Sequence, residues 1–553
     1  MMPAAPRSSS MAADLAIVGG GSVAVSLLYQ FLLVREAAGV SPACPPLHIV
    51  LFEPQAEPGP GGAYQDDLPS NLLNIPAGNM SARADRRMDF VDWLREQDPA
   101  WLRGMGVDGV AASDFLPRPL FGAYLRAVHA RCRKLAAALG VTLLHVQSRV
   151  RRVVPLPDGG ARIDPEHGAS WLARHAVLCN GNLPSQAFPD LQDKPGYFNS
   201  PYPVSQLAST IPQDASVCVV GTSLSAVDAI AALQQSGHHG PILCASRNGR
   251  LPSVRSPHNQ APAALRHLSR DGAVQLAARH GGALSVDVIA QALKDEVQAL
   301  GGTLDPDEIV GLPADAQTAL DEEIRRSSHG ARPWQAVAAA TNAAVDQIWH
   351  LMPDSERHRF QSQWRSLWMA RRATFPMRNA LKLQALLKTG QLQVHAGYVD
   401  SHYDPASQQF HTQLRSADGN VTHRSQYLIN ATSFSVDAQR TRDPLIAALL
   451  HDGHARPDPF GGLALDFETG CLKDTNDSVL PQISVLGSLA GGTYFWTTSM
   501  DVNARLARDQ AQRIAAALGR PATLTDPETP ADNPSPARWT AHRPTHPAPA
   551  ASS

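Results

Sequence analysis

The stretch LAIVGGGSVAVSLLYQFLL, residues 15–33, decides the fold. A short apolar run ends at Gly19 and a long apolar run follows Gly21, the order of a buried strand, a tight turn and a buried helix. Gly19, Gly21 and Ala24 fill the spacing G-x-G-x-x-G/A. Small residues there let the backbone approach a pyrophosphate at the helix N-terminus. We therefore predict a dinucleotide-binding turn that also contains Gly20 and Ser22.

An acidic residue follows the next predicted strand, in the phrase HIVLFEP, residues 48–54. Glu53 stands where a carboxylate accepts hydrogen bonds from the two hydroxyls of a ribose. Its distance from Gly19 in the sequence exceeds the usual ~20 residues, which we attribute to the Pro-rich loop 41–46. Strand, turn, helix and acid together make this prediction specific.

A second stretch, SVCVVGTSLSAVDAIAAL at residues 216–233, has the same pattern in weaker form. Gly221 is followed by Ser223 at the second glycine position, and the Cβ of a serine would stand where the backbone should meet phosphate. The next strand ends in CASRNGRLP, residues 244–252, which has no acid but offers Ser246 and Arg247 to a 2′-phosphate. The charge favours NADPH over NADH, and both stay open.

The alternation of strand-like and helical segments along the chain is typical of α/β proteins with parallel sheets. Residues 263–375 differ, because they show successive helical patterns without strand signals. We expect two Rossmann-like parallel-sheet domains, one for each dinucleotide motif, with a helical insertion.

Composition excludes several classes of protein. Lys and Arg number 48 against 50 Asp and Glu, so no global positive charge would bind nucleic acid. The N-terminus lacks the apolar core of a secretory signal, and no apolar run reaches the ~20 residues that span a bilayer. We expect a cytoplasmic protein without membrane contact; its oligomeric state is left open. Six scattered cysteines and the absence of known catalytic motifs predict no metal site and leave the catalytic residues unassigned.

Several phrases resemble a known bacterial group: residues 57–94 (EPGPGG to VDWL), 115–125 (FLPRPLFGAYL), 246–252 (SRNGRLP) and 427–433 (YLINATS). The chain is similar to the FAD/NAD(P)-binding proteins that include an FAD-dependent urate hydroxylase and an aspartate N-monooxygenase. The resemblance implies that Gly19 to Ser22 and Glu53 hold the adenosine diphosphate of FAD. It further implies that Asn74 to Ser81, with Met80, pass near the isoalloxazine.

Two turns depart from the pattern of that group. Where such flavoproteins have an A-T-G turn, this chain has Asn180-Gly181-Asn182 and Ala431-Thr432-Ser433. One glycine is therefore retained and the other replaced, which puts in question the two places where the chain crosses between domains.

The resemblance implies an oxidoreductase, namely an FAD-dependent monooxygenase that consumes NADH or NADPH and O₂ and acts through a flavin hydroperoxide on a small nitrogenous substrate. Urate comes first, with a role in purine catabolism. The alternative is an amino-acid N-monooxygenase. Further alternatives are a non-catalytic FAD-binding sensor and an NAD(P)H dehydrogenase.

The segment RHRFQSQWRSLWMARRATFPMR, residues 357–378, is the candidate for the substrate side. Phe360, Trp364 and Trp368 recur every four residues, and Arg371 and Arg372 could hold an anion by paired hydrogen bonds. The other interpretation is an amphipathic helix with its aromatic stripe in the core and its arginines in water.

The predicted domain order follows from these assignments. It is a flexible leader (1–13), the first part of the FAD-binding domain (14–200), the first part of the NAD(P)-binding domain (201–262), the helical insertion (263–375), a return to the NAD(P)/FAD domain (376–435), the C-terminal part of the FAD-binding domain (436–525) and a disordered tail (526–553). Met11 is an alternative start to Met1.

Overall fold

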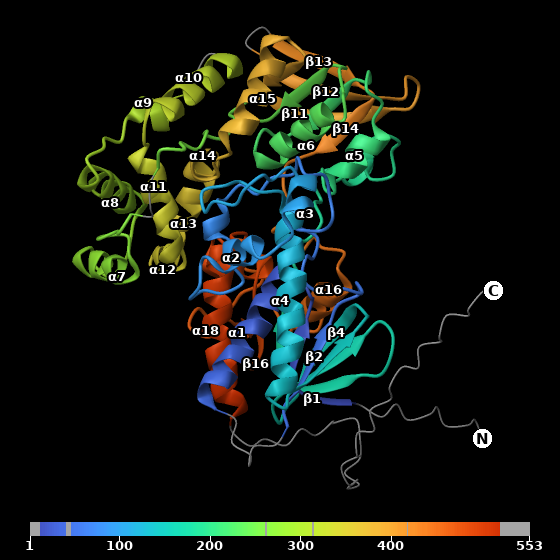
Figure 1. The fold of residues 1–553 in the computed structure, drawn as a ribbon, viewed down its shortest axis with the longest axis vertical. Helices are drawn as coiled ribbons and strands as arrows, with labels where there is room; N and C mark the ends of the chain where they lie inside the picture. The colour runs from blue at the N-terminus through green and yellow to red at the C-terminus, as the bar shows by residue number, and fades with distance from the viewer. Residues whose placement is uncertain (1–10, 40–45, 260–262, 312–314, 417–418, 520–553) are drawn as a thin grey trace, which may run out of the picture.

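The computed structural model describes residues 11–39, 46–259, 263–311, 315–416 and 419–519. The predicted tail, residues 1–10 of the predicted leader and the loop 41–45 lie outside the described residues. Figure 1 shows two lobes, one above the other, with an arm of helices along one side of both.

The lower lobe is built on an eight-stranded sheet with a parallel centre. Its strands are β1 (Met11–Val18), β2 (His48–Phe52), β3 (Thr142–Val146), β4 (Val150–Pro155), β5 (Ala161–Pro165), β6 (Trp171–Leu178), β15 (Cys471–Lys473) and β16 (Val479–Val485). The order is β15-β16-β6-β1-β2-β3, and the antiparallel pair β4-β5 joins it at β6. One of the two neighbours of β1 is therefore β6, a strand that comes far later in the chain.

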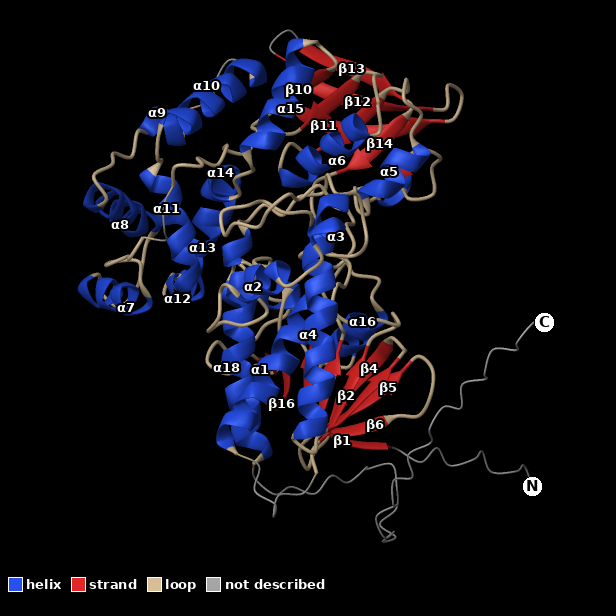
Figure 2. Ribbon diagram, in the orientation of Figure 1, coloured by secondary structure: helices blue, strands red, loops and turns tan. Residues whose placement is uncertain are grey.

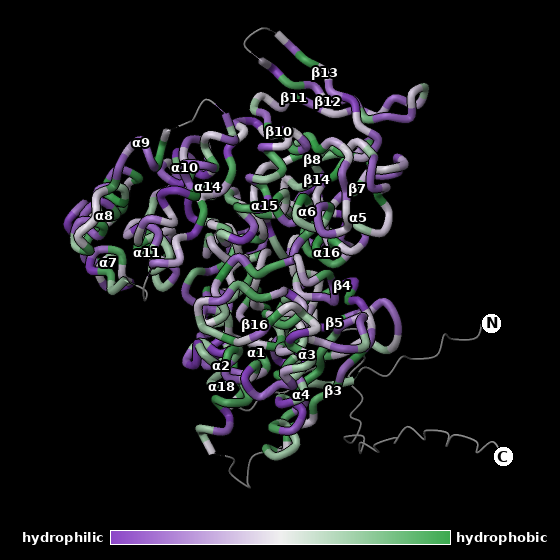
Figure 3. The backbone as a smooth tube through the Cα atoms, turned by 45° about the horizontal axis from the view of Figure 1, so that its top comes forward, coloured by the Kyte–Doolittle hydropathy of each residue, from purple (hydrophilic) through white to green (hydrophobic). Residues whose placement is uncertain are grey.

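Three long helices pack beside this sheet (Figure 2): α1 (Ser22–Ala38), α4 (Arg118–Ala138) and α18 (Met500–Leu518). The largest core of the protein lies between these helices and the strands, and hydrophobic residues gather around α1 and β16 in Figure 3. Gln30 fastens α1 to α18, because its side-chain amide donates to the Ala504 carbonyl at 2.8 Å. Four smaller helices lie elsewhere in this lobe: α2 (Asp89–Arg95), α3 (Pro99–Gly104), α16 (Pro444–His451) and α17 (Gly491–Tyr494).

The upper lobe contains a five-stranded parallel sheet in the order β10-β9-β8-β14-β7. Its strands are β7 (Tyr197–Phe198), β8 (Val217–Val220), β9 (Ile242–Ala245), β10 (Leu392–His395) and β14 (Tyr427–Asn430), with helices α5 (Val204–Thr210), α6 (Leu224–Gln235) and α15 (Met377–Lys388). An antiparallel meander, β11 (Tyr398–Asp404), β12 (Gln409–Ser416) and β13 (Gly419–Ser425), adds a third sheet. The predicted fold class is confirmed.

Between β9 and β10 the chain forms the helical arm. Its helices are α7 (Arg270–Arg279), α8 (Val286–Ala299), α9 (Pro306–Ile309), α10 (Ala316–His329), α11 (Pro333–Ala340), α12 (Val345–His350), α13 (Asp354–Arg359) and α14 (Arg365–Arg372). The described residues from 263 to 372 contain no strand. We call this segment the insertion.

Two of the predicted boundaries are wrong. Met11 to Ala13 belong to β1 and not to a leader, because they pair in register with Trp171 to Ala173 of β6. Tyr197 and Phe198 belong to the second sheet and not to the first domain, because they pair with β14. Both errors concern strand ends, where a neighbouring strand decides how far the extended backbone continues.

The insertion is fastened to the lower lobe by a buried carboxylate. Asp346 of α12 is 2% exposed and lies between Arg505 of α18 at 2.7 Å and Arg270 of α7 at 2.8 Å. Burial acts to raise the pKa of Asp346, but the charges of Arg505 and Arg270 outweigh it and hold the pKa below its usual value. One acid thus joins segments that are far apart in the sequence.

Replacing Asp346→Asn should lower the free energy of unfolding by about 3–5 kcal/mol, because two partly buried arginines lose their counter-charge. The contribution of Asp346 is present above its unfolded pKa of ~3.9 and is lost as the pH falls below that value. Chemical denaturation at neutral and acid pH measures both effects. Asp437→Asn, at an exposed ion pair with Arg440, is the control and should change stability by less than ~0.5 kcal/mol. Equal effects of the two variants would contradict the role of Asp346.

Candidate functional site

The first dinucleotide turn is built around a glycine that no other residue can replace. Gly19 has φ +99°, and a Cβ at this position would stand 2.3 Å from the Cys179 carbonyl oxygen at the end of β6. Its amide donates to the Phe52 carbonyl at 2.8 Å. The turn is therefore fixed to both neighbours of β1, and its position follows from the strand order.

Glu53 lies directly beside this turn. The Gly20 amide donates to Glu53 Oε2 at 2.8 Å, and the Gln55 amide donates to Oε1 at 3.0 Å. The half-buried carboxylate still has unused lone pairs for ribose hydroxyls. The structure thus brings together the glycine turn and the acid that the sequence proposed as its partner.

The N-terminus of α1 is half-buried and lies opposite Gly61. Gly21 caps the helix with φ −75°, and a Cβ there would meet nothing nearer than the Gly61 Cα at 3.6 Å. Gly61 in turn has φ +54°. Ser22 begins the helix, Ala24 is buried, and the first amides of the helix point outward with its positive dipole end. This cradle of glycines and free amides fits a pyrophosphate.

Residues 74–81 approach the same helix. Met80 and Ser81 are buried, Asn74 is half-buried, and the Ser26 hydroxyl of α1 donates to the Ala82 carbonyl at 2.6 Å. The segment is held against α1 just beyond its first turn, which is compatible with a position beside a dinucleotide that extends from the cradle.

The second turn repeats the construction of the first. Gly221 has φ +117°, and a Cβ there would stand 2.5 Å from the Ala431 carbonyl oxygen at the end of β14. Ser223 caps α6 with φ −91° and ψ −165°, close to the −75° and −169° of Gly21. Since this conformation is open to any residue, the serine does not distort the turn.

Two residues after β9 were proposed to bind a 2′-phosphate, and they differ in availability. The Ser246 hydroxyl is shared between the Thr222 hydroxyl at 2.9 Å and the Gly249 amide at 3.0 Å. Arg247 is exposed and has no ion pair or side-chain hydrogen bond among the described residues. It also lies near Arg365, since burial and then the charge of Arg247 lower the pKa of Arg365. Sequence reasoning placed Arg365 in the substrate-side segment 357–378 and did not connect it with Arg247, because α14 comes far later in the chain.

A cavity of about 220 Å³ lies where the two lobes meet. It is lined by Asn182, Pro184, Ser185, Asn199, Ser200, Pro201, Tyr202, Ser225, Asn430, Ser433 and Phe434. The two turns that differ from the A-T-G pattern, residues 180–182 and 431–433, thus both contribute to this cavity. Gly181 has φ +77° and Ser433 has φ +90°, so the serine adopts the backbone conformation that favours glycine.

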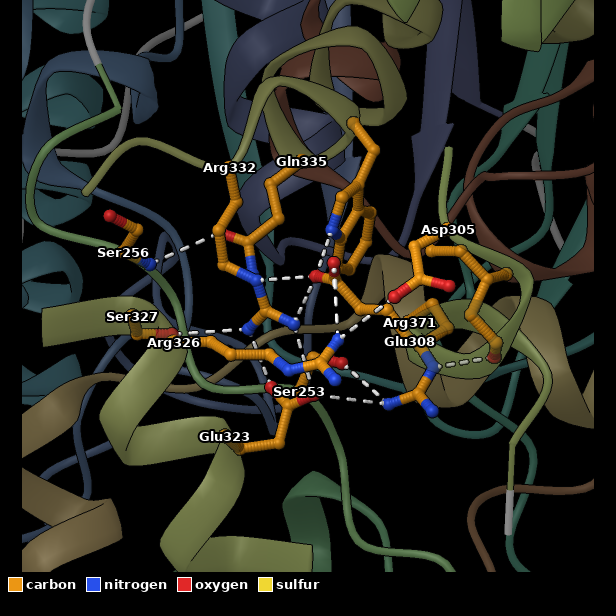
Figure 4. Close-up of polar contacts among 12 residues, drawn as sticks. Ser253, Ser256, Asp305, Glu308, Glu323, Arg326, Ser327, Arg332, Gln335 and Arg371 are labelled. Atoms are coloured by element: carbon orange, nitrogen blue, oxygen red, sulfur yellow. Dashed lines mark hydrogen bonds and ion pairs between the residues drawn. The ribbon is translucent and has the colours of Figure 1, made fainter. Parts of the chain in front are cut away.

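The two proposed substrate arginines point to different places. Arg371 joins the ion-pair network at the base of the insertion, where it donates to the Ile309 carbonyl at 2.8 Å and the Ser253 hydroxyl at 3.0 Å (Figure 4). Arg372 is 8% exposed and donates to Asn342 Oδ1 at 2.6 Å. Arg371 therefore has a structural set of partners, whereas most donors of Arg372 stay unused.

The aromatic stripe is not a regular α-helix. Residues Phe360–Trp364 form a π-helical segment between α13 and α14, a feature that is frequent at functional sites. Phe360 packs on Trp349 and Phe495, whereas the Nε1 atoms of Trp364 and Trp368 are buried without an acceptor. Phe360 and Trp364 thus pack half-buried against a hydrophobic cluster of the insertion, and Trp364 and Trp368 carry unpaired donors.

Comparisons with known proteins agree with this geometry. Residues 16–183 match the model of a family described as FAD-NAD(P)-binding. The lower lobe holds the expected FAD/NAD(P)-binding domain. An uncharacterized protein of Escherichia coli K12, YdhS, is 22% identical over 431 residues, which are 69% of this chain and 76% of that protein.

Three solved structures share the fold over most of the chain. L-lysine 6-monooxygenase from Pseudomonas syringae has a TM-score of 0.53 at 15% identity, over 92% of this chain and 99% of its own. The reduced ornithine hydroxylase of Pseudomonas aeruginosa has 0.51 at 13%, over 92% and 100%. The FAD-bound cadaverine monooxygenase of Erwinia amylovora has 0.50 at 14%, over 95% and 100%. At these identities the likeness shows a common fold.

Membrane-spanning helices and clusters of metal ligands are both absent from the described residues. None of their helices has the length and apolar character needed to cross a membrane. Their His, Cys, Asp and Glu side chains form no group of three or more that could hold a metal ion.

Gly19→Ala and Gly21→Ala should separate folding from cofactor binding. Gly19→Ala should lower the melting temperature of the FAD-free protein, because its Cβ meets a backbone carbonyl. Gly21→Ala should leave that melting temperature unchanged but weaken FAD binding at least ~10-fold, because its methyl group enters the cradle. Thermal unfolding and FAD titration measure the two effects. Normal FAD binding by Gly21→Ala would contradict the cradle.

Ser433→Gly should stabilise the protein by about 1 kcal/mol, because a left-handed conformation strains a serine by about 1–3 kcal/mol while glycine costs about 0.5–1 kcal/mol of chain entropy. Denaturant unfolding measures the change. Ser435→Gly, two residues away and without a positive φ, is the control and should lower stability. A loss of stability in both variants would show that Ser433 is not strained.

Proposed function

We propose that this chain is an FAD-dependent, NAD(P)H-consuming monooxygenase that hydroxylates the nitrogen of a small amine or amino acid. The observation that carries the proposal is the cavity between the lobes. Asn182 follows the first sheet's β6 and Ser433 follows the second sheet's β14, and both line it. Parallel α/β sheets bind ligands at the carboxyl ends of their strands, so the two nucleotide sites open toward each other.

The lower lobe would hold FAD. The cradle of Gly19, Gly20 and Gly21 takes the pyrophosphate, Glu53 takes the adenosine ribose, and residues 74–81 direct the flavin end along α1. When bound, FAD accepts a hydride from the nicotinamide and transfers one oxygen atom of O₂ to the substrate. The overall reaction converts R–NH₂, O₂, NAD(P)H and H⁺ into R–NHOH, H₂O and NAD(P)⁺.

The upper lobe would hold the nicotinamide nucleotide, with the pyrophosphate of that nucleotide at the N-terminus of α6. Gly221 makes the close approach possible, and Ser223 has the backbone conformation of its glycine counterpart. Arg247 and Arg365 supply positive charge at the end of β9, without a carboxylate partner for Arg247. We infer NADPH as the preferred coenzyme, because its 2′-phosphate suits these cations.

The protein's own part in the reaction is to position the substrate and exclude water. Where the insertion meets residues 487–495 of the lower lobe, Trp349 stacks on Phe495 with 4.8 Å between ring centroids. Phe360 packs against the same ring at 5.5 Å. These rings come from the insertion and from the lower lobe. They form an apolar wall where the insertion covers residues 487–495.

The choice of substrate rests on the comparisons. The three solved structures are described as acting on lysine, ornithine and cadaverine, all of which carry an amine. None of these three structures is described as acting on urate, so the alternative, an amino-acid N-monooxygenase, has more support than the first substrate.

The deciding experiment has two stages. FAD-loaded protein is mixed with NADPH or NADH without oxygen, and flavin bleaching is followed; then O₂ is admitted with lysine, ornithine, aspartate, cadaverine or urate. Bleaching followed by formation of a hydroxylamine from one amine supports the proposal. Loss of urate instead would support the first substrate, and no bleaching with either coenzyme would overturn the monooxygenase.

Arg247→Ala should raise the KM for NADPH about tenfold, because a charge-assisted hydrogen bond to phosphate contributes about 1.5–3 kcal/mol. The KM for NADH should stay unchanged, which makes NADH the internal control. Anaerobic flavin reduction rates at varied coenzyme concentration measure both. An equal increase for the two coenzymes would contradict a 2′-phosphate role for Arg247.

A further inference from the structure

Arg372, which is buried, and Arg255, which is half-buried, lack the carboxylate partners that the buried Arg332 has. Arg332 of the insertion, for example, is 4% exposed and pairs with Glu308 and Glu323, each at 2.6 Å. Arg255 and Arg372 have no carboxylate within 4.0 Å among the described residues. A buried cation without a counter-charge costs several kcal/mol.

The two arginines lie together. Arg255 donates through Nε to the Thr374 hydroxyl at 3.0 Å, two residues from Arg372. Burial lowers the pKa of each guanidinium to about 10, and the charge of Arg255 contributes to the lowering at Arg372. The charge of Asp501 acts on Arg372 in the opposite sense, but it forms no ion pair with Arg372. Asn342, which accepts from Arg372, donates to Asp501 at 3.4 Å. The pair therefore concentrates positive charge.

Tryptophans complete the cluster. The guanidinium carbon of Arg372 lies 5.6 Å from the centre of the Trp496 ring, and Trp368 meets Trp496 edge to face at 6.4 Å. The Trp368 Nε1 donor is buried and has no acceptor. Because an unpaired buried donor is costly, a ligand that accepts hydrogen bonds would relieve it. The cluster offers many donors and an aromatic floor.

The cluster borders the FAD-binding lobe. Trp496 follows the segment 487–495, in which the Ser488 hydroxyl donates to Asn182, a residue of the cavity between the lobes. A Cβ at Gly487 would stand 3.7 Å from Val23 in the first turn of α1. The segment thus connects the cluster to the N-terminus of α1, where the dinucleotide cradle lies.

We propose that Arg255, Arg372 and Trp368 form a subsite that binds a carboxylate group of the substrate. This inference rests on the proposed function, since it assigns the substrate of that site to carboxylate-bearing amines. A planar carboxylate can take paired hydrogen bonds from a guanidinium fork and a further one from an indole N–H. A diamine without a carboxylate leaves both cations uncompensated and is excluded.

A phosphate of the nicotinamide nucleotide is the other anion of similar chemistry. The free charge of Arg247 at the end of β9 already suits the 2′-phosphate, so the cluster is assigned to the substrate. Competition by NADP⁺ distinguishes the two sources.

The test measures binding without turnover. FAD-loaded protein is titrated calorimetrically with succinate or glutarate, which carry carboxylates but no reactive nitrogen, and with cadaverine. Succinate or glutarate should bind and cadaverine should not. Arg372→Gln and Arg255→Gln should each weaken the dicarboxylate at least ~10-fold, and Trp368→Phe a few-fold. Arg440→Gln, at an exposed position, is the matched control and should bind normally.

Stability gives a second measurement that separates a binding role from a structural one. Without ligand, Arg372→Gln should melt at the same temperature as the wild-type protein or higher, because an uncompensated charge is removed. A lower melting temperature with unchanged dicarboxylate binding would overturn the subsite. So would binding of neither dicarboxylate by the wild-type protein, or full displacement of succinate by NADP⁺. Failure of flavin reduction would affect the proposed function and leave these outcomes readable.

Discussion

The structure depends on a close contact between a glycine and a backbone carbonyl. The carbonyl stands at the end of the strand after which the chain crosses to the other lobe. At Gly19 the carbonyl belongs to Cys179, and at Gly221 it belongs to Ala431. In both places a tight turn is possible only because no side chain separates the two backbones. The contact fixes where the strand before the helix ends relative to the strand after which the chain crosses to the other lobe. The cavity between the lobes is lined by Asn182 and Ser433, which lie three and two residues beyond these contacts.

Charge pairing distinguishes the structural parts of the insertion from its candidate binding part. Asp346 takes two arginines, and Arg332 takes two glutamates, so these buried charges are compensated and fasten helices together. Where Arg255 and Arg372 meet, neither forms an ion pair among the described residues, and Asp501 is the acid whose charge acts on Arg372. A protein that pairs its buried charges in one region leaves them unpaired in another at a cost in stability, and ligand binding is the physical reason for accepting that cost.

The sequence predicted the parts of the fold that local patterns encode. The two βα turns need small residues at fixed spacing, and the run of helical patterns identified the insertion. Ser223 was doubted because its Cβ was placed near phosphate, whereas its extended backbone is ordinary. The antiparallel meander β11–β13 was not predicted, since its strands are mostly polar and exposed. Contacts such as that of Arg255 with Thr374 join segments more than a hundred residues apart, and one sequence contains no local signal for them.

The backbone at Phe495 carries one further consequence. Its φ of 64° and ψ of −66°, with the Trp496 amide donating to the Tyr494 carbonyl at 2.8 Å, form the rarer kind of γ-turn, which is strained in a residue other than glycine. The ring of Phe495 is held by Trp349 and Phe360, which belong to the insertion. The lower lobe holds the turn as well, because the Phe495 amide donates to the Gly491 carbonyl at 2.8 Å and both Phe495 and Trp496 pack against its core. The aromatic floor beside Arg372 therefore depends on the insertion and the lower lobe together, and a change that loosens either one should shift Trp496.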